Sequence, residues 1–69
     1  MPSDSLRLTA DLDSWVVTLA TGDVLSVRAH GVREEGDDLV FVALIEGSPA
    51  LEYELLRLPS KAVAAWSGG

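Results

Sequence analysis

Apolar and polar residues alternate along most of this chain with a period of two, the pattern of β-strands that bury one face. Leu25, Val27 and Ala29, for example, alternate with polar residues. The pattern predicts strands over residues 6–12, 15–20, 25–30, 39–45, 51–55 and 62–66, the first of them at a sheet edge. Turns are predicted near Gly22, Gly36 and Gly47, where glycine stands beside acidic residues or proline.

The alternation breaks after Leu55, at Leu56-Arg57-Leu58, which indicates a bulge or a bend in that strand. A helix over residues 50–58 is the competing interpretation, because Leu51, Leu55 and Leu58 would share one of its faces. The strand is preferred because its period-two alternation continues the pattern of the preceding segments.

Short strands joined by tight turns, without a helix to cover a sheet, must close on themselves or leave a face in water. The sequence therefore predicts an all-β fold, a small five- to six-stranded, partly open barrel of antiparallel strands. Residues 1–69 form a single domain, with disordered ends at 1–4 and 67–69. A domain of this size has a thin core, and without cysteine it must rely on close packing or self-association.

The stretch Leu58-Pro59-Ser60-Lys61-Ala62-Val63 resembles the Leu-Pro-Ser-Asn-Tyr-Val stretch that closes Src-homology-three domains. In that family a strand ends at the proline, one helical turn follows, and the last strand begins at the valine. The resemblance implies an SH3-like barrel over about residues 14–66. The tyrosine that lines the peptide groove of that family is Ala62 here, and only Pro59 matches a groove residue, so peptide binding is not carried over.

The stretch from Val17 to Leu25 is similar to the first motif of Sm-like barrels. The aspartate and asparagine that hold RNA bases in that family have no counterpart after Ala29, and the Arg-Gly of its second motif is missing. Five basic against eleven acidic residues give a formal net charge of −6, which repels phosphate backbones and anionic lipid. Nucleic acid and membranes are therefore not expected as partners.

No apolar run approaches the roughly 20 residues of a membrane span, so the expected compartment is the cytoplasm. The absence of Asn, Gln and Cys suits a G+C-rich bacterial genome.

No residue reaches the specificity of a catalytic, cofactor or metal signature, so the chain is not expected to be an enzyme. The acidic turn from Glu34 to Asp38 lacks the alternating spacing of a calcium loop and is interpreted as solvated charge. His30, the only histidine, is interpreted as a surface residue without an orienting partner. The final Gly68-Gly69 resembles the end of ubiquitin-like modifiers, but the long helix of their fold has no counterpart, so a frayed tail is expected.

Residues 39–45 are apolar on both faces, and such a strand is normally buried on both. Without a helix to cover it, one face should be exposed in a monomer, which predicts self-association. Trp15 and Trp66 are interpreted mainly as packing residues, with an aromatic binding face as the alternative. The candidate interface residues are Val40, Val42, Leu44 and Trp66. In the alternative to a second copy, residues 6–12 of the same chain fold over the exposed face of residues 39–45.

The function these features favour is a non-catalytic protein–protein interaction or accessory module that self-associates. The alternatives are an accessory subunit whose active site a partner chain completes, and an Sm-like nucleic-acid binder, which the charge disfavours.

Overall fold

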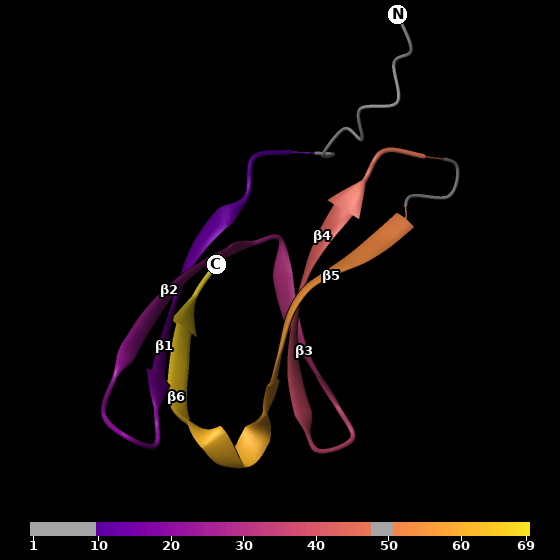
Figure 1. Ribbon diagram of the computed structural model, residues 1–69. Coiled ribbons are helices and arrows are strands. Elements are labelled where there is room, and N and C mark those ends of the chain that lie inside the picture. The colour runs from indigo at the N-terminus through magenta and orange to yellow at the C-terminus, as the bar shows by residue number, and fades with distance from the viewer. Residues whose placement is uncertain (1–9, 48–50) are drawn as a thin grey trace, which may run out of the picture.

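The computed structural model describes residues 10–47 and 51–69, which form six β-strands in two antiparallel three-stranded sheets (Figure 1). The strands are β1 (Asp13–Leu19), β2 (Val24–Ala29), β3 (Gly31–Glu35), β4 (Asp38–Ile45), β5 (Leu51–Pro59) and β6 (Val63–Gly68). The first sheet has the order β2-β1-β6 and the second the order β3-β4-β5. The all-β prediction is confirmed. Within the described ranges, no helix could span a membrane.

The predicted turns at Gly22 and Gly36 are confirmed, because these glycines close the β1–β2 and β3–β4 hairpins. Both have positive φ, 98° and 59°, a backbone conformation that favours glycine. Between β4 and β5, Glu46 and Gly47 form a bend, and the rest of that connection lies outside the described residues.

Five of the six predicted strands are confirmed as β1, β2, β4, β5 and β6. The helix alternative for residues 50–58 is wrong over its described part, because β5 is extended. Its predicted bulge is confirmed: Phe41 pairs with Leu56 and Val42 with Glu54, which leaves Leu55 as an extra residue.

The predicted N-terminal strand, 6–12, falls mostly outside the described residues, and its described part, 10–12, is not a strand. The strand that the sequence pattern missed is β3, which carries the consecutive charged residues Arg33, Glu34 and Glu35. Such a run is typical of a loop. It is compatible with a strand here because Arg33 and Glu35 are held in ion pairs.

Strands β2 and β3 are two halves of one bent segment, with only His30 between them. The backbone N–H of His30 donates to the carbonyl of Val42 at 2.8 Å. Its ring bridges two backbone groups: Nδ1 accepts from the N–H of Leu44 at 2.7 Å, and Nε2 donates to the carbonyl of Ala10 at 2.8 Å. His30 is therefore a structural link between the corner of the sheets and β4.

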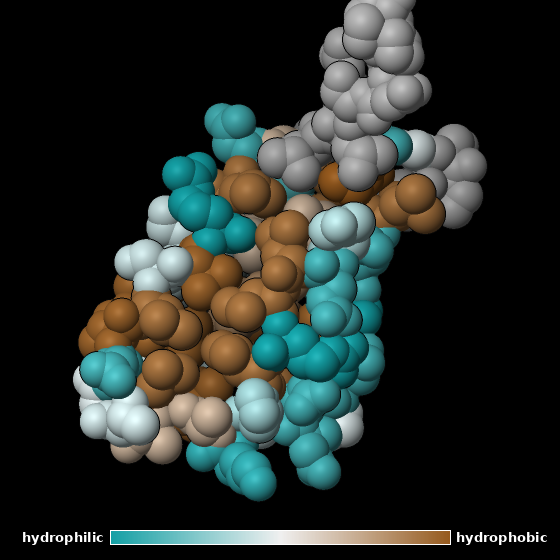
Figure 2. Space-filling model, in the orientation of Figure 1, coloured by the Kyte–Doolittle hydropathy of each residue, from teal (hydrophilic) through white to brown (hydrophobic). Residues whose placement is uncertain are grey.

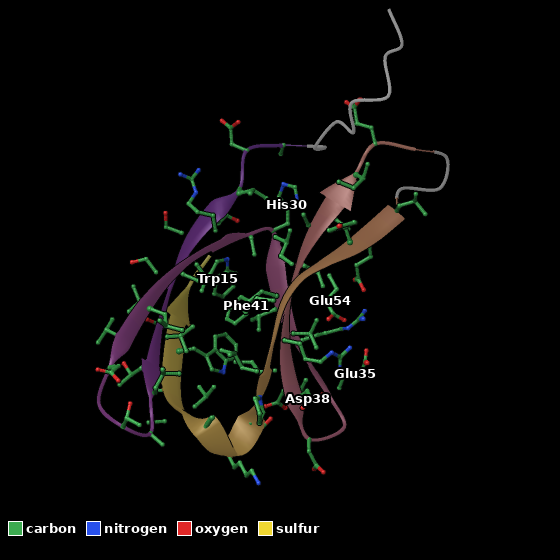
Figure 3. The ribbon with its side chains drawn as sticks, viewed as in Figure 1. Trp15, His30, Glu35, Asp38, Phe41 and Glu54 are labelled. Carbon is green, nitrogen blue, oxygen red and sulfur yellow. The ribbon has the colours of Figure 1, made fainter. Side chains whose placement is uncertain are left out.

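The core lies between the sheets and centres on Trp15, which is 8% exposed (Figure 3). Its indole Nε1 donates to the carbonyl of Ala29 at 3.0 Å, and its ring meets Phe41 edge-on at 6.1 Å. The other buried members of this cluster are Val17, Ala29 and Leu39. The interpretation of Trp15 as a packing residue is confirmed.

The predicted disorder of residues 67–69 is wrong, because β6 continues to Gly68, which pairs with Trp15. The next N–H, that of Gly69, donates to the carbonyl of Ser14 at 3.3 Å. Gly68 has φ 134°, and a Cβ there would lie 2.5 Å from the Ser14 carbonyl oxygen. Gly68 is thus part of the sheet, where close contact with β1 requires glycine, and Gly69 follows it with one backbone hydrogen bond to β1. The expectation for residues 1–4 lies outside the described residues.

Candidate interaction surface

Strand β5 is the most exposed apolar segment at a sheet edge. It has nine residues, and among the strands of the described residues only β4 pairs with it. Leu51, Tyr53 and Leu55 are 63%, 53% and 42% exposed. An edge strand also presents a row of unpaired backbone N–H and C=O groups. This segment therefore offers both apolar side chains and main-chain hydrogen bonds to a partner.

The bulge at Leu55 sorts the side chains of β5 between two faces, since directly opposite residues of neighbouring strands share a face. On the core face, which packs toward the first sheet, β5 carries Leu51, Tyr53, Leu56 and Leu58. On the outer face it carries Glu52, Glu54 and Arg57. In a regular strand Glu54 and Arg57 would point to opposite faces, because they are three residues apart. Figure 2 shows hydrophobic residues gathered over β1, β2 and β6, and hydrophilic ones along β3 and β5.

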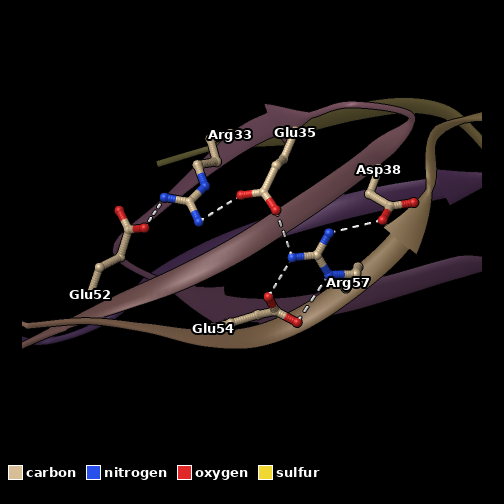
Figure 4. Close-up of polar contacts among 6 residues, drawn as sticks. All are labelled: Arg33, Glu35, Asp38, Glu52, Glu54 and Arg57. Atoms are coloured by element: carbon tan, nitrogen blue, oxygen red, sulfur yellow. Dashed lines mark hydrogen bonds and ion pairs between the residues drawn. The ribbon is translucent and has the colours of Figure 1, made fainter.

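Ion pairs join all three strands across this outer face (Figure 4). The guanidinium of Arg57 lies 2.7 Å from Glu54, 2.9 Å from Asp38 and 3.0 Å from Glu35. Arg33 on β3 continues the network, with Glu35 at 2.9 Å and with Glu52 of β5.

Protonation equilibria at Arg57 and Glu54 reflect this arrangement. Hydrogen bonds to Glu54, Asp38 and Glu35 raise the pKa of Arg57 above its ordinary value. The hydrogen bond from Arg57 holds the pKa of Glu54 below its ordinary value, against a smaller opposing effect of desolvation. Both groups are therefore charged at neutral pH.

This network covers the second apolar face of β4. Val40 lies between Arg33 and Arg57, which are its direct neighbours on β3 and β5. The Arg33–Glu52 pair crosses β4 above Val42, since Arg33 lies opposite Val40 and Glu52 opposite Leu44. The aliphatic stems of such side chains shield apolar surface while their charged ends remain in water.

The expected exposure of Val40 and Val42 in a single chain is therefore wrong: they are 0% and 7% exposed. Their register neighbours on this face include Arg33, Arg57 and Glu54 of the same sheet, an arrangement that the sequence pattern did not reveal. The alternative cover, residues 6–12, falls mostly outside the described residues. Leu44, beyond the network, is 38% exposed as expected.

Trp66 is also accessible, at 41%, but it lies elsewhere. It pairs with Val17 on the core side of β6, and its ring lies 5.8 Å from that of Trp15. Trp66 thus combines packing with exposure. The four candidate interface residues do not form one surface, because Leu44 belongs to the outer face of the second sheet and Trp66 to the core side of the first.

A hollow of about 350 Å³ lies beside Trp66, with Glu34 and Leu39 contributed by the second sheet. The remaining lining residues are Ser60, Val63, Ala64 and Ala65. The carboxylates of the acidic turn do not converge, since Glu34 lines this hollow whereas Glu35 and Asp38 bind Arg57. Over residues 10–47 and 51–69, no three potential metal-ligating side chains form a cluster.

The functional features that sequence reasoning missed are the outer-face network and the prominence of β5. A signal was present in each case. Arg33 and Arg57 are the only basic residues within β3 and β5, and each stands near acidic residues in its strand. The predicted bulge already implied that Glu54 and Arg57 share a face.

Comparison with known proteins adds no relative: no protein-family model, no curated protein and no solved structure matches this chain.

Proposed function

We propose that this chain is a non-catalytic β-domain that functions by contact with proteins, including a second copy of itself. The observation that supports this function is β5, a nine-residue edge strand with three large side chains between 42% and 63% exposed. Stable monomers usually shorten such an edge or protect it with charged side chains, proline, a bulge or a covering segment. β5 is long, its only proline is the last residue, Pro59, and its charged side chains and bulge leave Leu51 and Tyr53 exposed.

We also propose that the two sheets belong to a partly open SH3-like barrel, acting in the cytoplasm. Three features support the barrel: the bent β2–β3 segment, the pairing of β6 with β1, and the 3-10 turn η1 (Ser60–Ala62) between β5 and β6. The local order of strand, helical turn and strand around Pro59 is the one implied by the resemblance to Src-homology-three domains.

An accessory enzyme subunit is the second candidate, and the hollow beside Trp66 favours it. Its volume of about 350 Å³ is at the lower end of the size of small-molecule sites. Its polar groups, Glu34 and Ser60, do not form a nucleophile–base pair within the chain, so a partner would have to supply the chemistry.

Sedimentation equilibrium of the full chain, from micromolar to millimolar concentration, tests the main proposal. We expect a reversible, concentration-dependent rise in mass. Native mass spectrometry of the same sample checks the second candidate. A strictly monomeric chain that carries a small molecule in stoichiometric amount would contradict self-association and favour the enzyme subunit.

A further inference from the structure

We infer that β5 pairs antiparallel with β5 of a second copy about a two-fold axis perpendicular to the second sheet. The second sheet of one copy and the second sheet of the other then form one continuous sheet, in which the two β5 edges pair with each other. This inference rests on the proposed self-association and names the surface that performs it.

The order of side chains along β5 is self-complementary about the bulge. Pairing Glu54 with Arg57 of the second copy places Tyr53 opposite Leu58 and Leu55 opposite Leu56. Directly opposite residues must share a face, and here Glu54 and Arg57 both belong to the outer face while Tyr53 and Leu58 both belong to the core face. A regular strand could not meet this condition, because residues three apart would lie on opposite faces. The bulge thus makes the match possible.

Charge and apolar pairing together favour this register, because pairing Glu52 with Arg57 instead would place Glu54 opposite Leu55. The two-fold axis generates two Glu54–Arg57 contacts, one in each direction, and opposite charges on directly paired residues are stabilising. Centring the axis on Glu54 would place like charges against each other, and centring it on Tyr53 would pair Glu52 with Glu54. The outer-face network, which already joins β3, β4 and β5, would then continue into the second copy.

A charged substitution at the bulge tests this surface. Leu55 is 42% exposed and has no paired residue on β4, so Leu55→Lys should leave the fold intact while placing two lysines beside the axis. Val24→Lys is the matched control, since Val24 is 62% exposed on β2, at the edge of the other sheet. By sedimentation, Leu55→Lys should raise the dimer dissociation constant by about tenfold or more, and Val24→Lys should leave it unchanged.

Cysteine cross-linking gives an independent measurement, because the natural chain has no cysteine. Leu55→Cys should form a disulfide-linked dimer on mild oxidation, since the axis brings the two copies of this residue onto adjacent strands. Val24→Cys should form no disulfide-linked dimer under the same conditions. Circular dichroism confirms that each variant is folded, and if Leu55→Lys unfolds, the cross-linking result decides.

Different outcomes contradict self-association and β5 pairing. A wild-type chain that is monomeric at millimolar concentration contradicts self-association and this surface together. A wild-type dimer whose constant is unchanged by Leu55→Lys, or that does not cross-link through Leu55→Cys, retains self-association and overturns β5 pairing.

Discussion

Strands β4 and β5 are neighbours in one sheet and both are rich in large apolar residues, yet their environments differ. Every residue of β4 after Asp38 is apolar, and all of these except Leu44 are buried. In β5, Leu51, Tyr53 and Leu55 are among the most exposed large side chains of the described residues. What separates the strands is position: β4 is central, with a neighbour on each side, whereas β5 is the edge.

An apolar strand can therefore be buried on both faces without an apolar partner on each. The core face of β4 packs toward Trp15, as Phe41 shows. Its outer face is covered by Arg33 and Arg57 with their acidic partners. Because these ions remain about half exposed, they avoid the desolvation penalty of a buried ion pair.

The largest contrast is expected between Phe41→Ala on β4 and Tyr53→Ala on β5. Phe41 is fully buried, and its removal should lower the free energy of unfolding by about 3–5 kcal/mol through lost contacts and a cavity. Tyr53 is 53% exposed, so its truncation should cost less than about 1 kcal/mol. Urea denaturation followed by tryptophan fluorescence measures both. In dilute, monomeric samples, equal losses would mean that β5 is covered within the single chain.

A charge introduced on the outer face of β4 should destabilise the domain more at a buried position than at an exposed one. Val42 is 7% exposed and lies opposite Glu54, so Val42→Glu should destabilise the domain by about 2–4 kcal/mol. Leu44→Glu, at a position 38% exposed and opposite Glu52, should lower stability by no more than about 1 kcal/mol. Thermal denaturation compares the two. A folded Val42→Glu variant of wild-type stability would contradict the network as the cover of β4.

The sequence predicted strands from local alternation, and this succeeded wherever one strand face is wet, as in β2 and the first half of β5. It failed for β3, because Glu34, which lies opposite Leu39 on the core face, breaks the alternation, and because the ion-pair partners of Arg33 and Glu35 on β5 are distant in the chain. The alternation also led to a wrong prediction that Val40 and Val42 are exposed in a single chain, because their burial depends on sheet order and register. Alternation specifies which residues share a face, whereas burial of that face depends on what lies across it.

Replacing Arg57 tests whether its stem or its charge covers Val40. Arg57→Ala removes both and should lower the melting temperature measurably, while Arg57→Met retains an aliphatic stem and should lower it less. Amide hydrogen exchange at Val40 should follow the same order. If Arg57→Met is as destabilising as Arg57→Ala, charge compensation of Glu35, Asp38 and Glu54 outweighs the stem.

The smallest expected effect is the acid sensitivity contributed by Glu54. Its pKa lies below the ordinary value of about 4.5 because Arg57 donates a hydrogen bond to the carboxylate. A carboxyl group whose pKa is lowered by folding binds its proton more readily in the unfolded chain. The contribution of Glu54 to stability is therefore fully present above about pH 4.5. It is lost as the pH falls through the lower pKa that Glu54 has in the folded chain.

The melting temperature of wild type should thus exceed that of Glu54→Gln at neutral pH, with a difference that shrinks on acidification. In an Arg57→Met background the same Glu54→Gln substitution should leave little pH-dependent difference, because the cause of the shift is gone. A pH-dependent difference that persists in that background would mean that Arg57 is not the cause of the shift. No difference between wild type and Glu54→Gln at any pH would show that Glu54 stabilises β5 by packing against β4 and that its charge contributes nothing, because glutamine retains the shape of the side chain. The edge strand would then hold the outer face of β4 by shape alone, and the electrostatic half of the contrast between the two strands would rest on Arg33, Glu35 and Asp38.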